Sequence, residues 1–345
     1  MPGENRTKEN FFNSRLMLYL IAGVLAAAII GYHALLSPVA GPGQAREVTV
    51  TIPPRATAVQ VGALLKQSGI IKSPLAFRFY ARLQGLDESL KAGEYRISNG
   101  LSTPAVLREL VDGRLSLQTV TVPEGYTTAG VAELLAGEGL VDRERFLSAA
   151  GNDDFPYDFI SGLPHGSRRL EGYLFPDTYQ VARGSGERAV IDLMLSRFEK
   201  EIKDLNYEER AGQMGLTLHQ AVTVASMVES EAKVDRERPL IAGVIYNRLK
   251  RSMPLQIDAT VQYALAGHKE KLYYKDLEVD SPYNTYKIKG LPPGPIAMPG
   301  RASLIAAVNP VQTDYLYYVA KPDGTHAFAV TLEEHNANRE KYQPG

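Results

Sequence analysis

Two glutamates, two positions apart, interrupt a stretch that otherwise has the composition of a buried helix. Residues 225–249 read ASMVESEAKVDRERPLIAGVIYNRL and contain Glu229 and Glu231. Thr217 can cap a helix that begins at Leu218, and at 100° per residue the apolar side chains gather on one face. Glu229 falls about 20° from Leu218 on this wheel and Glu231 about 140° away. The pattern therefore predicts that Glu229 faces the core and Glu231 faces solvent.

A carboxyl group on the core-facing stripe of a helix can act as a general acid. Loss of hydration raises its pKa and keeps it protonated nearer neutral pH, which is the state a general acid needs. A structural glutamate paired with Arg236, Arg238 or Arg248 would satisfy the same pattern. Periodicity alone does not distinguish a catalytic role of Glu229 from a structural ion pair.

A second polar pair lies in MPLQIDATVQYAL, residues 253–265. Gln256 and Asp258 would share one face if this segment is extended. An Asp before Ala-Thr is also typical of a turn or a capped strand end. The pair therefore indicates either a site or local backbone capping.

A third candidate is SPYNTYKIKGLPPGPIAMPG, residues 281–300. Its tyrosines, Asn284 and Thr285 offer flat apolar faces beside amides and hydroxyls, which suits sugar rings and their hydroxyl groups. The prolines restrict the backbone and would hold these groups in place. A rigid loop with a purely structural role is the alternative.

Composition excludes several other chemistries. A net charge of −1 gives no basic surface for nucleic acid, and the absence of cysteine excludes thiol nucleophiles and thiolate metal sites. The six histidines form no His-x-x-x-His or His-Glu-x-x-His spacing, and neither a phosphate-binding glycine loop nor a Gly-x-Ser-x-Gly elbow is present. Carboxylates, amides and hydroxyls are therefore the groups from which a site must be built.

The elements that would position these groups follow from periodicity and turn residues. Amphipathic helices are expected at 187–202 and 216–232, and a strand or loop at 171–181. Residues 251–301 are expected to form loops with short strands. The runs 314–321 and 326–331 flank Pro-Asp-Gly-Thr and predict a β-hairpin.

The amino-terminal part contains the apolar run LMLYLIAGVLAAAIIGYHALL, residues 16–36. About 20 such residues can span a bilayer, and the basic residues lie before the run rather than after it. This predicts a single-pass inner-membrane protein with residues 1–15 cytoplasmic, a linker at 37–46, and an extracytoplasmic remainder. A cleaved signal peptide is the alternative, although the run is long for one.

An internal repeat follows the linker. TIPPRATAVQVGALLKQSGII (51–71) and TVPEGYTTAGVAELLAGEGLV (121–141) align without gaps, and each indicates a strand, a turn and a helix ended by glycine. The repeat is similar to LysM-like glycan-binding modules, although a structural spacer would have the same pattern. The predicted domains are a repeated α/β region at 47–165 and a catalytic domain at 166–345.

Several motifs in a fixed order resemble the YceG-like endolytic murein transglycosylases. They are EGYLFPDTY (171–179), ASMVESEA (225–232), ERPLIAGVIYNRL (237–249), MPLQIDATVQYAL (253–265), SPYNTYKIKGLPPGPIAMPG (281–300) and DYLYYV (314–319). The resemblance covers the carboxyl-terminal half of the chain. It implies an enzyme that cleaves peptidoglycan strands internally, between N-acetylmuramic acid and N-acetylglucosamine, and leaves a 1,6-anhydromuramoyl end.

The resemblance also implies roles for individual residues. The acid of the family maps to the first glutamate of SMVESEA, which is Glu229. Implied substrate-binding residues are Asn247, Gln256, Asp258, Tyr283, Asn284, Thr285 and Tyr286. Met298 departs from the asparagine that is more common in the family, which puts a polar role at that position in doubt. The family needs no cofactor, and peptidoglycan synthases (penicillin-binding proteins) are implied as candidate partners in the release of nascent strands.

The complete expectation is an α+β fold with an amino-terminal transmembrane helix, small LysM-like α/β modules and a mixed α/β catalytic domain that carries its acid on a helix. Two other classes of function stay open. A glycan-binding anchor without activity would need only the repeats and an aromatic groove. A muramidase that hydrolyses the same bond would need a second carboxylate near Glu229, for which Asp258 is the candidate.

Overall fold

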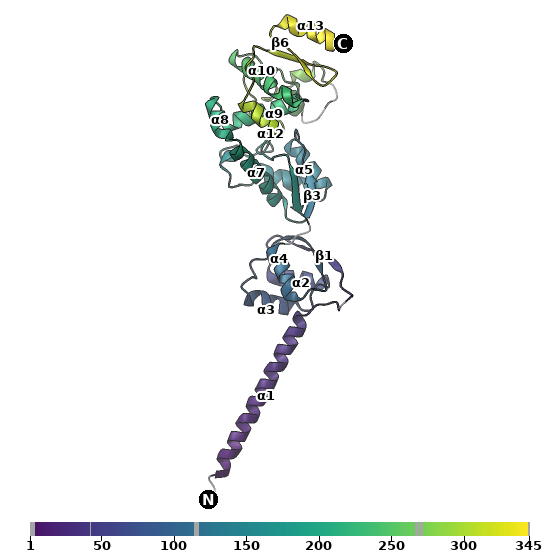
Figure 1. Cartoon of the computed structure of the whole chain (residues 1–345), viewed down its shortest axis with the longest axis vertical. Helices are drawn as coiled ribbons and strands as arrows, with labels where there is room; N and C mark the ends of the chain where they lie inside the picture. The colour runs from purple at the N-terminus through teal and green to yellow at the C-terminus, as the bar shows by residue number, and fades with distance from the viewer. Residues whose placement is uncertain (1–3, 42, 114–116, 266–268, 270–271, 344–345) are drawn as a thin grey trace. The chain divides into compact units, whose positions relative to one another are not determined.

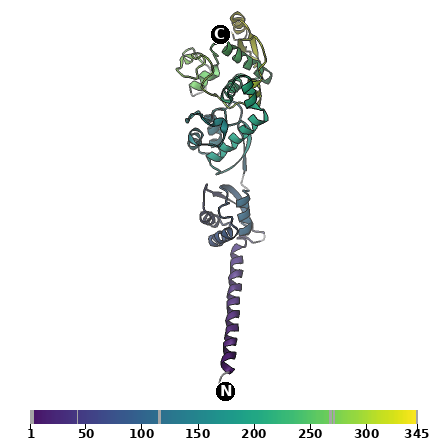
Figure 2. The same cartoon turned by 90° about the vertical axis from the view of Figure 1, so that its left-hand side faces the viewer.

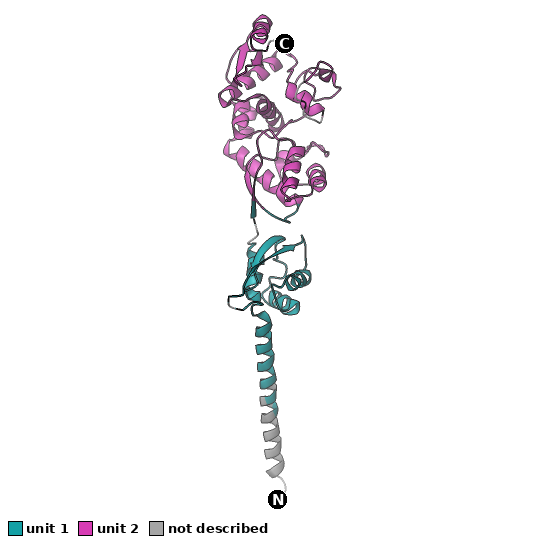
Figure 3. Ribbon diagram, turned by 90° about the vertical axis from the view of Figure 1, so that its right-hand side faces the viewer, with its two compact units in different colours: residues 1–118, 182–186 teal, residues 119–181, 187–345 magenta. Residues whose placement is uncertain are grey.

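The computed structural model describes residues 4–41, 43–113, 117–265, 269 and 272–343, which form two compact units. Unit 1 comprises residues 1–118 and 182–186, and unit 2 comprises residues 119–181 and 187–345 (Figure 3). Each unit has its own hydrophobic core. The predicted domain division at 165 and 166 stays a prediction, but the first repeat copy lies in unit 1 and the second in unit 2.

Unit 1 places three helices with a two-stranded antiparallel sheet. Strand β1 (Glu47–Ile52) pairs with β2 (Gly93–Ser98), and the helices are α2 (Ala58–Gln67), α3 (Pro74–Leu83) and α4 (Thr103–Asp112). The Thr57 hydroxyl accepts a hydrogen bond from the Gln60 backbone and begins α2 with a capping box. Phe77 and Tyr95 are fully buried, so the helices pack on the sheet through large side chains.

The second repeat copy has the same local structure within unit 2. Strand β3 (Leu117–Thr121) is followed by α5 (Thr128–Gly137), and Thr127 caps this helix as Thr57 caps α2. Gly69 and Gly139 both have left-handed backbone angles, with φ of 71° and 67°, just after the two helices. Both copies therefore contain the strand, turn and glycine-ended helix that the repeat predicts.

Helix α1 (Glu4–Leu36) covers the predicted membrane span. Over the residues that the structure describes, however, no helix is both long enough and apolar enough to cross a membrane. The prediction of a transmembrane helix at 16–36 was therefore wrong. The localisation that depended on it, a single-pass inner-membrane protein with a cytoplasmic amino terminus, was wrong for the same reason.

The expected fold class needs the corresponding correction. In its described residues the chain is a mixed α/β protein with thirteen α-helices and three two-stranded sheets, without the membrane-spanning helix. Unit 2 contains the remaining elements, except that Ala182 at the end of β4 belongs to unit 1 (Figure 1): α6 (Arg143–Asn152), β4 (Thr178–Ala182), α7 (Glu187–Asp204), α8 (Tyr207–Gln213), α9 (Leu218–Glu231), α10 (Arg238–Lys250), α11 (Asp258–Ala264), α12 (Arg301–Val308), β5 (Tyr317–Ala320), β6 (His326–Ala329) and α13 (Leu332–Tyr342).

Helix α9 lies in the core of unit 2 and packs against α8, α10, α11 and α12. Thr217 caps it as predicted, with Gln220 completing a capping box. All eight residues from Ala221 to Val228 are buried. Because the helix has neighbours on several sides, it lacks the single solvated face that a helical wheel assumes.

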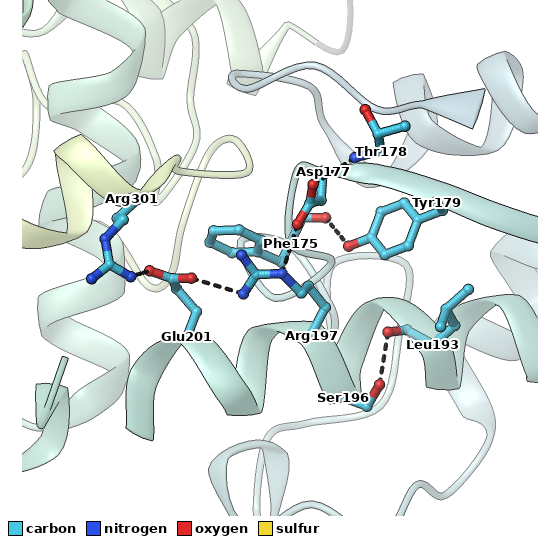
Figure 4. Close-up of polar contacts among 9 residues, drawn as sticks. All are labelled: Phe175, Asp177, Thr178, Tyr179, Leu193, Ser196, Arg197, Glu201 and Arg301. Carbon is cyan, nitrogen blue, oxygen red and sulfur yellow. Dashed lines mark hydrogen bonds and ion pairs between the residues drawn. The ribbon is translucent and has the colours of Figure 1, made fainter. Parts of the chain in front are cut away.

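A chain of ion pairs joins α7 to the start of α12 (Figure 4). The buried Glu201 carboxylate accepts hydrogen bonds from Arg197, at 2.7 Å, and from Arg301. Arg197 also donates to Asp177 at 2.6 Å, just before β4. The cluster fixes three separate segments of unit 2 by charge-assisted hydrogen bonds.

The carboxyl-terminal segment forms a hairpin covered by a helix, as both views of the chain show (Figures 1 and 2). Strands β5 and β6 pair antiparallel, which confirms the predicted hairpin, and α13 packs against both strands. Residues 251–301 were expected to contain short strands. In their described part they form loops, the short helix α11 and a 3-10 turn at Asp276–Glu278 instead.

Candidate functional site

Unit 2 contains a cavity of about 540 Å³, called the main cavity below. A volume of this size lies within the usual range for ligand pockets, about 300–1,000 Å³. The ends of α9 and α10, the segments before α11 and α12, the β5–β6 hairpin and one side of α13 contribute to it. Its lining residues are Glu231, Arg248, Leu255, Gln256, Asp258, Tyr274, Leu277, Tyr286, Tyr317, Tyr318, Val319, Ala320, His326, Leu332, His335, Asn336, Arg339 and Gln343.

Glu231, the last residue of α9, lines this cavity, and its carboxyl group has an environment that suits a general acid. Its pKa is raised to about 7, mainly by burial and also by the neighbouring negative charge of Asp258. Hydrogen bonds from the Tyr318 hydroxyl, at 3.1 Å, and from the Ala259 backbone act in the opposite direction. The group can therefore hold or release a proton near neutral pH.

The expectation that Glu231 lies on a solvated helix face was wrong. Glu231 ends α9, and Ala232 already has extended backbone angles, so the carboxyl group lies where the chain leaves the helix. The hairpin and α11 supply its surroundings through Tyr318 and Asp258. Neither element is near it in the sequence, so a helical wheel has no information about them.

Glu229 lies outside the lining of the main cavity and has structural partners on both oxygens. Its side chain is 6% exposed, and Oε1 accepts a hydrogen bond from Arg238 Nη1 at 3.1 Å. Oε2 accepts one from the Gly300 backbone N–H at 3.0 Å. Arg238 also donates to Ser303 at 2.6 Å. This is the ion-pair arrangement that the sequence left open for Glu229.

The glutamate, Arg238, Gly300 and Ser303 connect α9, α10 and α12. Arg238 also donates to Asp235 at 3.0 Å, so the guanidinium is held by two carboxylates and a hydroxyl. This network explains why a carboxylate is found on the core-facing stripe of α9. It positions helices rather than facing the main cavity.

Three of the other predicted substrate-binding residues line the main cavity. Gln256 donates its backbone N–H to Thr285 at 3.1 Å and accepts from Arg248 through its side chain at 3.2 Å. Asp258 begins α11 and accepts from the Tyr286 hydroxyl at 2.5 Å. Gln256, Asp258 and Tyr286 thus present an amide, a carboxylate and a phenol beside Glu231.

Asn247 and the two middle residues of the YNTY motif have structural hydrogen bonds. Asn247 donates to the carbonyl oxygens of Thr313 and Tyr315, which fixes the approach to β5. Asn284 is fully buried and donates to two backbone carbonyls. Thr285 is also fully buried and accepts from the Ile257 backbone at 2.9 Å. None of these three side chains lines the main cavity.

Tyr283 lies in a different cavity, beside Arg168 and His219. The Arg168 guanidinium lies 4.7 Å from the centre of its ring, and Tyr263 packs against the ring at 4.9 Å. Although the YNTY motif is continuous in the sequence, only Tyr286 of its four residues reaches the main cavity.

A raised pKa alone does not identify an acid in this chain. Burial also raises the pKa of Glu171 to about 7, since its carboxyl group is enclosed between the Thr128 backbone, at 2.9 Å, and the Tyr263 hydroxyl, at 3.1 Å. Glu171 does not line the main cavity. What distinguishes Glu231 is the combination of a raised pKa with access to a cavity.

Sequence reasoning did not single out Arg248, Tyr318 or the lining residues of α13 as members of the site. The motif DYLYYV contains Tyr317 and Tyr318, so the family resemblance does extend to that part of the cavity wall. Arg248 was considered only as a partner of Glu229. Instead it donates to backbone carbonyls of Pro254, Leu255 and Leu316. No short motif points to α13, which packs on the hairpin and lines the cavity with side chains of its own.

Met298, the position that departs from the family pattern, is fully buried. Its sulfur accepts a hydrogen bond from the Gly172 backbone N–H at 3.2 Å. Its own backbone bonds to Gly125 and Tyr126. The thioether therefore takes a weak acceptor role between separate segments of unit 2.

Comparison with known proteins agrees with this architecture. A model of the YceG-like family matches residues 50–341. A Bacillus subtilis (strain 168) protein named endolytic murein transglycosylase is 34% identical over 331 residues, which cover 92% of this chain and 91% of that protein. A Streptococcus pneumoniae serotype 2 (strain D39) protein with the same name is 33% identical over 93% of this chain and 63% of its own length.

One solved structure is also similar. The crystal structure of a putative YceG-like protein from Listeria monocytogenes matches with a TM-score of 0.57 and 34% identity, and the match covers 85% of this chain and 99% of that one. The family model and the relatives each cover most of the chain. The chain belongs to the YceG-like family.

Proposed function

We propose that this chain is an endolytic murein transglycosylase and that Glu231 is its general acid and base. Membership of the YceG-like family and the names of its relatives support the activity. The observation that supports Glu231 is its carboxyl group, which lines the main cavity with a pKa raised to about 7. Glu229, which the resemblance favoured, is already engaged by Arg238 and Gly300.

The reaction needs only one carboxyl group. Protonated Glu231 gives its proton to the oxygen that links N-acetylmuramic acid to N-acetylglucosamine, and the bond between that oxygen and C1 breaks. The C6 hydroxyl oxygen of the same muramoyl residue bonds to C1, and its proton passes to the Glu231 carboxylate. The products are a free hydroxyl on one fragment and a 1,6-anhydro ring on the other. No water is consumed, and the acid is restored.

The neighbouring groups fit the needs of this mechanism. An attacking hydroxyl in the same sugar avoids the entropic cost of bringing in a second molecule. The Asp258 carboxylate, beside Glu231, favours the protonated acid and can stabilise positive charge that develops at C1. The Tyr318 hydroxyl orients the Glu231 carboxyl group from the hairpin.

A hydrolytic mechanism is the second candidate, because Asp258 supplies a second carboxylate in the same cavity. In that case Asp258 would attack C1 or activate a water molecule, as in glycosidases that use two carboxyl groups. The Tyr286 hydroxyl donates to Asp258 Oδ1 at 2.5 Å, so the other carboxylate oxygen of Asp258 would have to take this role. The products would be reducing ends, which are heavier than anhydro ends by one water.

The decisive experiment incubates the full chain and two variants, Glu231→Gln and Glu229→Gln, with purified peptidoglycan and analyses the products by mass spectrometry. We expect anhydromuramoyl ends from the wild type and at least about 100-fold slower cleavage by Glu231→Gln, which is the lower end of general acid catalysis. Glu229→Gln should cleave in proportion to its folded fraction, with a lower melting temperature because it weakens the Arg238 pair.

Circular dichroism of all three proteins separates loss of chemistry from loss of fold. A natively folded Glu229→Gln without activity, beside an active Glu231→Gln, would reverse the assignment. Reducing ends from the wild type would establish the hydrolytic mechanism. A wild type that cleaves nothing would contradict the activity itself and favour a non-catalytic glycan-binding role.

Internal cleavage of glycan strands also suggests a purpose and further partners. An enzyme that cuts within strands can release nascent strands from the synthases that extend them, so penicillin-binding proteins are the proposed partners. The two LysM-like repeat copies are proposed to bind glycan. These two proposals rest on the family resemblance and on the strand-turn-helix repeat.

A further inference from the structure

The carboxyl-terminal helix α13 has an unusual composition for an element that packs on a sheet. Its sequence is LEEHNANREKY, and none of its residues is fully buried. Most helices in proteins are held by an apolar face, and a short isolated helix is marginal in water. The polar character of α13 therefore calls for a role other than filling the core.

Specific polar and aromatic contacts hold α13 in place. Thr331 and Glu334 form a capping box at its start, and the Gln343 side chain donates to the Ala320 carbonyl at 3.2 Å. The His335 ring stacks on Tyr317 of β5 with centres 5.1 Å apart. The helix is therefore fixed on the hairpin, with a defined side toward the main cavity.

That side is a regular stripe. Leu332, His335, Asn336 and Arg339 line the main cavity, and their spacing of three and four residues places them on one helical face. A stripe at this spacing is usually apolar when it packs on a core. Here three of its four side chains are polar and border the same cavity as Glu231.

Two of these groups have unused binding capacity. Within the part of the chain that the structure describes, the Arg339 guanidinium has no hydrogen-bond or ion-pair partner. The His335 Nδ1 atom is buried and also lacks a partner there. This ring nitrogen therefore has a hydrogen-bonding position that no protein group of the described chain occupies.

The charged groups beside this stripe, Arg339 and Arg248, are cations, whereas the carboxyl groups of the cavity are those of Glu231 and Asp258. Arg248 lines the same cavity, and the described structure satisfies its guanidinium with neutral oxygens. Arg339 and Arg248 are both close enough to lower the pKa of His335, in addition to the effect of burial. A guanidinium without a carboxylate partner can bind a carboxylate through two parallel hydrogen bonds.

We propose that the cavity-facing stripe of α13 binds a carboxylate of the peptide stem carried by the glycan strand, with Arg339, at the carboxyl-terminal end of the stripe, as the charged ligand. This inference rests on the proposed function, since it assigns a second part of the same substrate to the same cavity. The muramoyl residue that reacts at Glu231 is also the residue that carries the stem. A stem-binding wall beside the acid would make the enzyme prefer strands that retain their peptides.

The test compares two substrates and two matched variants of the full chain. Purified glycan strands are used with their peptide stems intact and after removal of the stems by an amidase. Arg339→Ala removes the proposed ligand to the stem, and Lys341→Ala removes one positive charge from an exposed position of the same helix outside the cavity lining. The readout is kcat/KM for cleavage, measured by chromatography and mass spectrometry.

We expect Arg339→Ala to lower kcat/KM for stem-bearing strands about tenfold, the effect of one charge-assisted hydrogen bond, and to change kcat/KM for stripped strands less than about twofold. Lys341→Ala should change neither value. An equal loss on both substrates, or no loss on stem-bearing strands, would overturn the proposal.

A binding measurement separates this proposal from the proposed activity. In a Glu231→Gln background, Arg339→Ala should weaken the binding of stem-bearing strand fragments about tenfold and leave that of stripped fragments unchanged. This result would uphold stem recognition even if the wild type cleaved neither strand. If Glu231→Gln binds both fragments equally, with and without Arg339→Ala, stem recognition is excluded even if the wild type cleaves both strands.

Discussion

At the scale of single residues, the two glutamates of α9 differ in their surroundings and not in their chemistry. Both carry the same carboxyl group, but Glu229 is enclosed by cationic and backbone donors and Glu231 opens onto a cavity. Burial near another carboxylate stabilises the protonated form of a carboxyl group. The environment of Glu231 is therefore the one that suits a general acid.

This assignment predicts the pH dependence of the reaction. Because Glu231 must be protonated to act, kcat/KM should fall as the pH rises through about 7, the value to which burial raises its pKa. Tyr318→Phe removes a hydrogen bond that lowers this pKa, so the falling limb should move to higher pH. Asp258→Asn removes a charge that raises it, so the limb should move to lower pH.

The measurement is a pH profile of kcat/KM for the wild type and both variants. Shifts in opposite directions would identify Glu231 as the titrating group, because Tyr318 lowers its pKa and Asp258 raises it. Three identical profiles would mean that another group controls the limb. Glu171→Gln is the control, because Glu171 has a similarly raised pKa but does not line the main cavity.

At the scale of elements, the ion-pair cluster around Glu201 should contribute measurably to the stability of unit 2. Its carboxylate is buried, with 2% of the side chain exposed, and accepts from two arginines that belong to different elements (Figure 4). Glu201→Ala should lower the free energy of unfolding by about 2–3 kcal/mol, because both guanidinium groups lose a charged acceptor.

Glu199→Ala is the matched control, two residues earlier on the same helix. Glu199 pairs with Lys203, whose side chain is 69% exposed, so its loss should cost less than about 0.5 kcal/mol. Urea denaturation of the three proteins measures both values. Equal effects of the two substitutions would show that the cluster in Figure 4 adds no more than a surface pair.

Sequence periodicity predicted elements better than it predicted their surroundings. Thr217 caps α9, the helix near 187 forms α7, and the hairpin pairs as expected. Local capping and turn residues determine these features, and such residues are visible in one short stretch. The role of Glu231 depended on Tyr318 and Asp258, which approach α9 only in the folded chain.

The YNTY motif illustrates the same limit. Its four residues are adjacent in the sequence, but Asn284 and Thr285 bond to backbone in the interior while Tyr286 reaches Asp258. In an irregular loop, side-chain direction follows neither a period of two nor one of 3.6. Composition could therefore identify the segment, but it could not divide its residues between framework and site.

At the scale of the whole molecule, two separate cores predict two unfolding events. Phe77 is fully buried in unit 1 and Phe198 in unit 2, and each lies in a different hydrophobic cluster. Phe77→Ala should destabilise unit 1 by about 3–5 kcal/mol and leave unit 2 unchanged, and Phe198→Ala should do the reverse. Differential scanning calorimetry should resolve one shifted transition in each variant. A single transition that both substitutions lower equally would mean that the units unfold together.

Gln256 combines two features whose requirements conflict. Its φ of 51° is a left-handed backbone angle that glycine adopts more easily, yet its side chain lines the main cavity and accepts from Arg248. Glycine would remove the backbone strain together with the side chain that lines the cavity. Glutamine supplies that side chain and retains the strain. We therefore expect Gln256→Gly to raise the melting temperature and to lower turnover together.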